Sequence, residues 1–228
     1  MIKTLQISNK RVGSTFLQNT LNSHPVILSI GEIFGVSYND NGKEVDGIPV
    51  FKSCNIPKGQ YMKWVHDKND ITNIKIMYNQ MMRWDLNDYI LDKNFNIIHL
   101  MRRNHFRRVM SQLIEGYSLK GLNDIENDKI ILEIEKSIQN ETLFRQKLSL
   151  TQGKYIELYY EDIIGDTIGD KTYLSEYTNF ELCNMFEVKN IPMFSLTKKK
   201  NTQERILDNL KDLDGLKKIF KEKEWEWL

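Results

Sequence analysis

Short runs of apolar and β-branched residues alternate along the chain with longer segments of helical periodicity. The short runs predict strands at residues 2–8, 26–30, 73–77, 96–101 and 154–160. Helical spacing predicts helices at residues 14–21, 80–91, 106–117, 129–150, 179–187 and 204–221. This alternation favours an α/β fold, a three-layer domain whose central, mostly parallel sheet of about five strands is covered by helices on both faces.

The stretch between the second and third strands lacks such a pattern. Residues 35–72 are rich in Gly, Asn, Asp, Lys and Pro, and a long irregular stretch inside a compact domain is typical of a lid or binding loop. No internal repeat and no low-complexity tract divides the chain. We therefore expect a single domain over residues 1–228 with a long binding loop at 35–72.

Composition is that of an ordinary soluble globular protein. Of 228 residues, 40% are hydrophobic, and 32 Lys and Arg nearly cancel 31 Asp and Glu. A protein that coats nucleic acid carries a large basic excess, so we expect no nucleic-acid partner and only a local basic site. The sequence shows neither a membrane span nor a signal-peptide core, and Cys54 and Cys183 lie far apart. These features predict a cytoplasmic protein.

The first predicted strand ends in a basic turn. Lys10 and Arg11 precede Gly13, and the hydroxyls of Ser14 and Thr15 lie at the start of the next helix. A helix N-terminus binds phosphate or sulfate through its free N–H groups, and a glycine lets the backbone approach the anion closely. The alternative is a basic helix cap that binds nothing. The Walker A string GxxxxGK[ST] does not occur in the sequence, which disfavours a kinase that uses Mg-ATP.

A second basic cluster follows the fourth strand. Its four arginines, at the strand end and the start of the next helix, are Arg102, Arg103, Arg107 and Arg108. Guanidinium groups suit phosphate oxygens, and we expect Arg103, at the strand-to-helix turn, to be a ligand. Ser111 adds a hydroxyl if it faces the same site, whereas Arg107 and Arg108 are expected on a solvated helix face. Since ligands bind at the carboxyl ends of parallel strands, both clusters are expected to hold one ligand that has phosphates at both ends.

The two motifs resemble those of sulfotransferases that use 3'-phosphoadenylyl sulfate (PAPS), in particular the bacterial carbohydrate-sulfating type related to Nod-factor sulfotransferases. The 5'-phosphosulfate loop of that family, [PK]-R-x-G-[ST]-T, is matched by residues 10–15. Its 3'-phosphate motif is a strand ending in R-R-N with a serine eight residues after the second arginine, matched by Arg102, Arg103, Asn104 and Ser111. Further matches are N-S-H-P at 22–25, G-E-[IL]-F at 31–34, Y-E-D-[LI] at 160–163 and K-[KQ]-N-T at 199–202. They follow the family order along nearly the whole chain.

The resemblance implies a P-loop-like domain that moves a sulfuryl group from PAPS to a hydroxyl of an acceptor, a saccharide or glycolipid, with no metal ion. The residues that it implies around the donor are Lys10, Arg11, Val12, Gly13, Ser14, Thr15, Phe16, Arg103, Ser111, Lys199, Lys200 and Asn201. It places Arg11 against the transferred group, with Lys10 as the substitute if the loop register shifts by one. It also implies a structural role for Glu161 and Asp162.

Transfer to a hydroxyl needs a general base that takes the proton. We expect Glu32 in this role, because it closes the second strand beside the first loop. The alternatives are an ion pair of Glu32 with Arg11 or Lys10, and His66 of the long loop as the base, although a surface histidine is the more expected role for His66. Two other functions stay open: a small P-loop kinase that uses Mg-ATP, and a non-catalytic module that binds a nucleotide or an anionic glycan.

Overall fold

A sheet of five parallel strands forms the centre of the molecule in the computed structural model, which describes residues 2–35, 44–87, 90, 95–117, 125–196 and 210–225. The strands are β1 (Ile2–Ser8), β2 (Leu28–Ile30), β5 (Ile71–Met77), β6 (Asn96–Met101) and β7 (Tyr155–Tyr159). Their order is β2-β5-β1-β6-β7, and all neighbours are parallel. The predicted α/β fold with a central parallel sheet is confirmed, and it is consistent with a P-loop-like domain.

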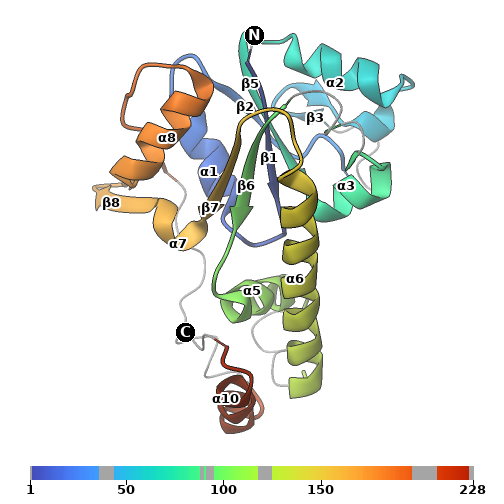
Figure 1. Ribbon diagram of the computed structural model, residues 1–228, viewed down its shortest axis with the longest axis vertical. Helices are drawn as coiled ribbons and strands as arrows, with labels where there is room; N and C mark the ends of the chain where they lie inside the picture. Colours follow the sequence, from blue (N-terminus) through green and yellow to red (C-terminus); the bar gives the residue numbers. More distant parts are fainter. Residues whose placement is uncertain are drawn as a thin grey trace.

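Helices cover both faces of this sheet (Figure 1). One face carries α1 (Ser14–Leu21) and α8 (Glu176–Phe186), and the other carries α2 (Lys58–His66), α3 (Tyr78–Trp84) and α6 (Asn127–Leu148). Successive strand residues point to opposite faces. Ile98 accordingly lies in the core cluster of Leu17 from α1, and Ile97 lies in the cluster of Phe144 from α6. Burial on both faces is consistent with the apolar run of β6, whereas β1 and β5 also bury polar side chains such as Gln6 and Asn73.

A third apolar cluster lies beyond the carboxyl ends of the strands. It joins α5 (His105–Tyr117), part of α6 and α10 (Leu213–Glu222), which Figure 1 shows below the sheet. The ring of Phe220 packs edge-on against Phe106 and Trp225, with centroids 5.4 and 5.3 Å away. This cluster fixes α5, the helix that carries the second basic motif.

Several short elements were not predicted from the sequence. The single-turn helix α7 (Tyr160–Ile163) follows β7 directly and leads into an antiparallel sheet of three strands, β8 (Ile164–Ile168), β9 (Lys171–Leu174) and β10 (Phe194–Ser195). A hairpin of β3 (Glu44–Val45) and β4 (Ile48–Pro49) turns at Asp46 and Gly47, whose φ angles are +52° and +73°. A 3₁₀ turn, η2 (Phe51–Ser53), follows this hairpin.

The prediction of an irregular stretch over residues 35–72 is wrong for much of its described part. The helix α2 lies inside it and buries Tyr61, Met62 and Val65. Two of these residues are four positions apart, which is a helical spacing. The polar composition hides that spacing, because the remaining face of α2 is solvent-exposed.

None of the helices within the described ranges is long and apolar enough to cross a lipid bilayer.

Two predicted helices differ from the structure at their ends. α3 begins at Tyr78 and ends at Trp84, because Asp85 adopts a left-handed conformation with φ +47°. α10 covers only the second half of the helix predicted at 204–221, and residues 197–209 lie outside the described residues. The other predicted helices are present with shifts of a few residues at their ends.

Candidate functional site

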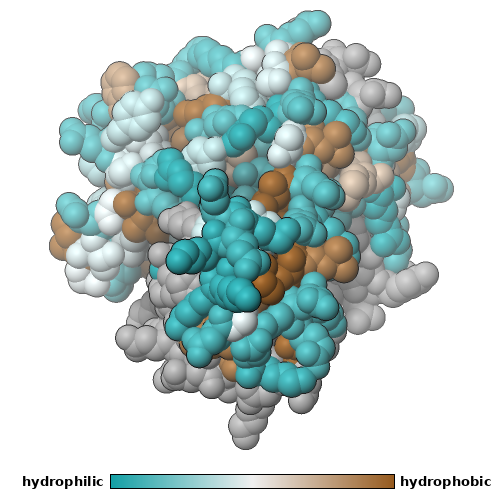
Figure 2. Space-filling model, turned by 60° about the horizontal axis from the view of Figure 1, so that its bottom comes forward, coloured by the Kyte–Doolittle hydropathy of each residue, from teal (hydrophilic) through white to brown (hydrophobic). Residues whose placement is uncertain are grey.

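The two predicted anion motifs meet at the carboxyl edge of the sheet. β1 and β6 are neighbouring strands, with Ser8 opposite Leu100, so the loops that follow them start side by side. Arg11 Nε donates a hydrogen bond of 3.1 Å to Oγ of Ser111, although the two residues are 100 positions apart. The structure therefore brings together one residue from each motif. Figure 2, which turns this end of the molecule forward, shows a mainly hydrophilic face among the described residues.

The loop after β1 has an unusual backbone. Arg11 and Gly13 both have positive φ angles, +62° and +84°. A Cβ atom at position 13 would lie 2.0 Å from a ring carbon of Tyr160, so only glycine fits there. Arg102 Nη1 also donates to the carbonyl oxygen of Arg11 over 3.2 Å. The loop is thus held between Tyr160 of α7 and Arg102, which directly follows β6.

The first turn of α1 faces this loop. Gly13 is the N-cap residue and provides no side-chain cap, and no acidic residue lies in the first turn. The N–H groups of a first turn have no carbonyl partner within the helix, and they carry positive partial charge. The side chains of Val12 and Phe16 are buried in the core, whereas Lys10 and Thr15 are exposed. Val12 and Phe16 can therefore contact an anion only through their backbone.

The arginines of the R-R-N motif are held by the acidic residues that follow β7. Both Nη atoms of Arg103 lie 2.5 Å from an oxygen of Asp162, and its guanidinium group lies over the ring of Tyr159. The hydrogen bonds from Arg103 lower the pKa of the Asp162 carboxyl. Arg102 Nε lies 3.5 Å from Glu161 Oε1. Glu161 and Asp162 thus orient the two arginines.

Arg108 contradicts the prediction of a solvated helix face. Its side chain is buried, and its Nη1 donates to Gln112 Oε1 over 2.9 Å and to the carbonyl oxygen of Lys10 over 3.5 Å. Burial lowers the pKa of Arg108 to about 10. Arg108 is buried because α5 packs against the loop that follows β1. Sequence reasoning missed this role, although Arg108 precedes Ser111 by three positions and so shares its helix face.

The predicted base, Glu32, lies at the same edge of the sheet. Its Oε1 is 3.1 Å from Nζ of Lys75, and its Oε2 accepts a hydrogen bond of 3.3 Å from Nε2 of Gln80. Lys75 also donates to Oγ1 of Thr15 over 3.3 Å. Glu32 thus forms an ion pair with Lys75, whereas the alternative interpretation had named Arg11 or Lys10 as its partner. The sequence signal for Lys75 was a lone charge near the end of a buried strand.

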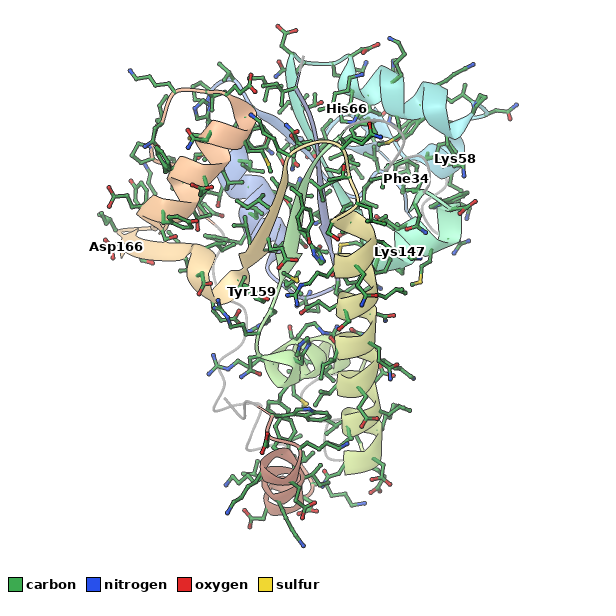
Figure 3. The ribbon with its side chains drawn as sticks, in the orientation of Figure 1. Phe34, Lys58, His66, Lys147, Tyr159 and Asp166 are labelled. Atoms are coloured by element: carbon green, nitrogen blue, oxygen red, sulfur yellow. The ribbon has the colours of Figure 1, made fainter. Side chains whose placement is uncertain are left out.

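His66 matches neither of its predicted roles. It is fully buried, and its Nδ1 lies 2.5 Å from Oγ1 of Thr72, near the start of β5. Burial, with the nearby charge of Lys3, lowers its pKa to about 3. Figure 3 shows His66 and Tyr159 at opposite ends of the sheet. His66 is therefore a core residue that lies far from the two anion motifs.

Three predicted contacts cannot be placed, because Lys199, Lys200 and Asn201 lie outside the described residues. Within the described ranges, no group of three or more His, Cys, Asp and Glu could hold a metal ion. An open cavity of about 460 Å³ lies against the C-terminal end of α1, lined by Asn19, Asn22, Ser23, Phe194 and Leu196. Since the anion motifs lie at the other end of α1, this cavity is not part of the candidate site.

The chain was compared with protein families, curated proteins and solved structures. No protein-family model and no curated protein matches it. Among solved structures, the crystal structure of a sulfotransferase from Alicyclobacillus acidocaldarius is similar to this chain, with 11% sequence identity, a TM-score of 0.46 and coverage of 95% of each chain.

Proposed function

We propose that this chain is a sulfotransferase that moves a sulfuryl group from PAPS to a hydroxyl of an acceptor, a saccharide or glycolipid. The observation that carries the proposal is the hydrogen bond between Arg11 and Ser111. The loop of Arg11 matches a 5'-phosphosulfate motif, and Ser111 belongs to a 3'-phosphate motif. A ligand that occupies both motifs has anionic groups at two separate positions, as PAPS does.

The donor contacts follow from the two motifs. The first turn of α1 and the exposed Lys10 supply N–H donors and positive charge for the phosphosulfate end. Ser111 and Arg103 supply a hydroxyl and a guanidinium group for the 3'-phosphate. The contacts of Arg103 with Asp162 occupy two of its five N–H donors, so a phosphate can share the same guanidinium group.

The PAPS donor supplies an activated sulfuryl group whose leaving group is a nucleotide phosphate. In an in-line displacement, the acceptor oxygen forms a bond to sulfur while the bond from sulfur to the phosphate oxygen breaks. Arg11 neutralises the negative charge that grows on the departing phosphate oxygen. Glu32 takes the proton of the attacking hydroxyl, and its side chain is 41% exposed, so an acceptor can reach it.

Two measurements test the proposal. Calorimetry should show binding of adenosine 3',5'-bisphosphate without metal and weaker binding of Mg-ATP. Mass spectrometry should then detect a sulfated product after incubation with PAPS and a panel of saccharides and glycolipids. Preferential binding of Mg-ATP would favour the kinase, and nucleotide binding without product on any acceptor would favour a non-catalytic module. Either result would overturn the proposed function.

A further inference from the structure

An aromatic ring at the end of β7 lies against the guanidinium group of Arg103. Met101, the last residue of β6, pairs with Tyr159 of β7, so Arg103 lies only two residues beyond this pair. The Cζ atom of Arg103 is 4.3 Å from the centroid of the Tyr159 ring, which Figure 3 shows at this end of the sheet. At that distance a cation is attracted to the electron-rich face of the ring. Asp162 therefore holds the guanidinium group by its edge, and Tyr159 holds it by its face.

The ring of Tyr159 is in turn held by α6. Alternate residues of a strand point to the same face, so Glu157 and Tyr159 lie side by side on the α6 side of the sheet. Arg145 of α6 contacts both of them. Its Nε donates to Oε1 of Glu157 over 2.9 Å, and its Nη2 donates to the hydroxyl oxygen of Tyr159. One arginine therefore fixes the tyrosine ring against the helix.

A chain of hydrogen bonds supports Glu157 from the interior. The Tyr155 hydroxyl donates to Oε1 of Glu157 over 2.7 Å and lies 3.0 Å from Nδ1 of His99. A hydroxyl has one proton to donate, so Nδ1 of His99 is the donor to Tyr155, and its Nε2 accepts from the Tyr78 hydroxyl at 2.5 Å. Burial lowers the pKa of His99 to about 3, which agrees with this neutral ring. Since each of these contacts joins a donor to an acceptor, the chain favours one arrangement of the side chains up to Arg145.

We propose that Tyr159 is a positioning residue for Arg103 and thereby strengthens selectivity for nucleotides that carry a 3'-phosphate, an inference that rests on the proposed function. An arginine side chain has many rotamers, and ordering it opposes ligand binding. The ring of Tyr159, fixed by Arg145, restricts this freedom before the ligand arrives. Less ordering is then needed when a phosphate binds. Tyr159 itself makes no contact with the nucleotide.

The central test is Tyr159→Leu, which keeps an apolar side chain and removes the ring. Binding of adenosine 3',5'-bisphosphate should weaken about three- to tenfold, the scale of a cation–π contact together with the ordering of one side chain. Adenosine 5'-phosphate has no group for Arg103, so its binding should change less than about twofold on the same argument. Calorimetry with both nucleotides gives the ratio of their affinities. Equal losses for the two nucleotides, as a merely structural role predicts, would overturn the inference.

Two companion variants define the role of the ring. Tyr159→Phe keeps the ring and loses only the hydroxyl, so it should recover most of the bisphosphate affinity lost in Tyr159→Leu. A loss as large as that of Tyr159→Leu would overturn the role of the ring. Tyr173→Leu is the matched control, because it makes the same change at another half-buried tyrosine, whose ring packs against Phe194 with centroids 5.6 Å apart. This control should bind both nucleotides as the parent does.

A double variant separates positioning from a direct contact with the nucleotide. In a chain that already carries Arg103→Ala, Tyr159→Leu should cost no further bisphosphate affinity, because no guanidinium group is left to orient. A further loss of about threefold or more would mean that Tyr159 contacts the nucleotide itself. That result would overturn the positioning role.

Folding and function are controlled separately. Tyr159→Met, whose flexible side chain fills irregular gaps, replaces Tyr159→Leu if that variant unfolds in a thermal scan. A parent chain that prefers the bisphosphate, together with a folded variant that keeps the same preference, would overturn the role of Tyr159 alone. A parent chain that does not bind adenosine 3',5'-bisphosphate would overturn the proposed function, and the role of Tyr159 with it.

Discussion

The contacts of Arg103 bear on its proposed role as a ligand of the 3'-phosphate. Its ion pair with Asp162 is well aligned, but the two side chains are 45% and 54% exposed. Ion pairs this exposed contribute about 0–1 kcal/mol to stability. A phosphate dianion is a stronger partner than one carboxylate, because it carries more charge and more acceptor oxygens. Asp162 therefore orients Arg103, and we expect this ion pair to leave the proposed binding of phosphate possible.

Arg103→Ala should weaken the binding of adenosine 3',5'-bisphosphate by about 1.5–3 kcal/mol, the scale of a charge-assisted hydrogen bond. Adenosine 5'-phosphate, which lacks the 3'-phosphate, should bind almost equally to both proteins. Calorimetry with the two nucleotides measures the difference. Asp162→Asn is the control and should bind the bisphosphate at least as tightly as the parent, because Arg103 loses its competing partner. Equal losses for both nucleotides in Arg103→Ala would show that Arg103 does not recognise the 3'-phosphate.

Arg11 is expected to act on the chemical step rather than on donor affinity. The charge that Arg11 is proposed to neutralise, on the departing phosphate oxygen, grows only in the transition state. Arg11→Ala should therefore lower turnover by roughly 10²–10³-fold, with a smaller change in donor binding. Steady-state kinetics and calorimetry on the same variant separate the two effects. Ser111→Ala is the companion variant, because it removes the hydroxyl that Arg11 Nε contacts. Normal turnover with weak donor binding in Arg11→Ala would assign Arg11 to binding alone.

A substitution at Glu32 tests its proposed role as the general base. Glu32→Gln keeps an oxygen and an amide at the positions of the carboxylate, and it removes the basic group. Donor binding should persist, while turnover should fall about 10²–10⁴-fold, the usual contribution of a general base. Gln80→Ala serves as the control, because it removes one support of Glu32 and leaves the carboxylate intact. Retained activity in Glu32→Gln would assign Glu32 a purely structural role.

At the scale of elements, the sequence predicts those whose pattern is set by burial alone. β6 is buried on both faces and has a clear apolar run, β1 alternates apolar with polar residues, and both strands have their predicted bounds. α2 was missed because its buried side chains alternate with lysines and a glycine. α7 is a single turn, too short to show helical periodicity. The left-handed Asp85 that ends α3 likewise has no sequence signal comparable to a glycine.

The turn between β1 and α1 depends on Gly13 in two ways. Gly13→Ala places a side chain at φ +84° and pushes its Cβ to 2.0 Å from the Tyr160 ring. Gly169→Ala is a matched control, since its φ is +63° and nothing lies within 4 Å of the added Cβ. The control should cost about 1–2 kcal/mol of unfolding free energy from backbone strain. Urea denaturation should show a larger loss for Gly13→Ala, and equal losses would mean that Tyr160 does not constrain the loop.

At the scale of the whole molecule, the site depends on how distant segments meet. The rule that ligands bind at carboxyl ends of parallel strands was enough to place the two basic motifs at one edge. It could not show that Lys75 would reach Thr15, because that contact depends on the register of β5 against β1. The burial of Arg108 depends likewise on the packing of α5 beneath the first loop. Local motifs were therefore predictable, and contacts between elements were not.

Buried ionisable groups tie the stability of the whole fold to pH. Burial lowers the pKa of His66 and His99 to about 3 and that of His105 to about 4. The unfolded chain therefore binds more protons below about pH 6.5, and the stability from these histidines is lost as the pH falls. Burial raises the pKa of Glu141 to about 7. For Glu141 the folded chain binds more protons between about pH 4.5 and 7, so its contribution falls as the pH rises.

Two substitutions should separate these opposite trends. Glu141→Gln removes the cost of ionising a buried carboxyl, so its unfolding free energy relative to the parent should rise by about 1–3 kcal/mol between pH 4.5 and pH 8. His66→Asn keeps a polar partner for Thr72 and removes a group that resists protonation, so its relative stability should rise as the pH falls below about 6.5. Urea unfolding at a series of pH values measures both slopes. A difference from the parent that stays constant with pH would show that the substituted group titrates alike in the folded and unfolded chains.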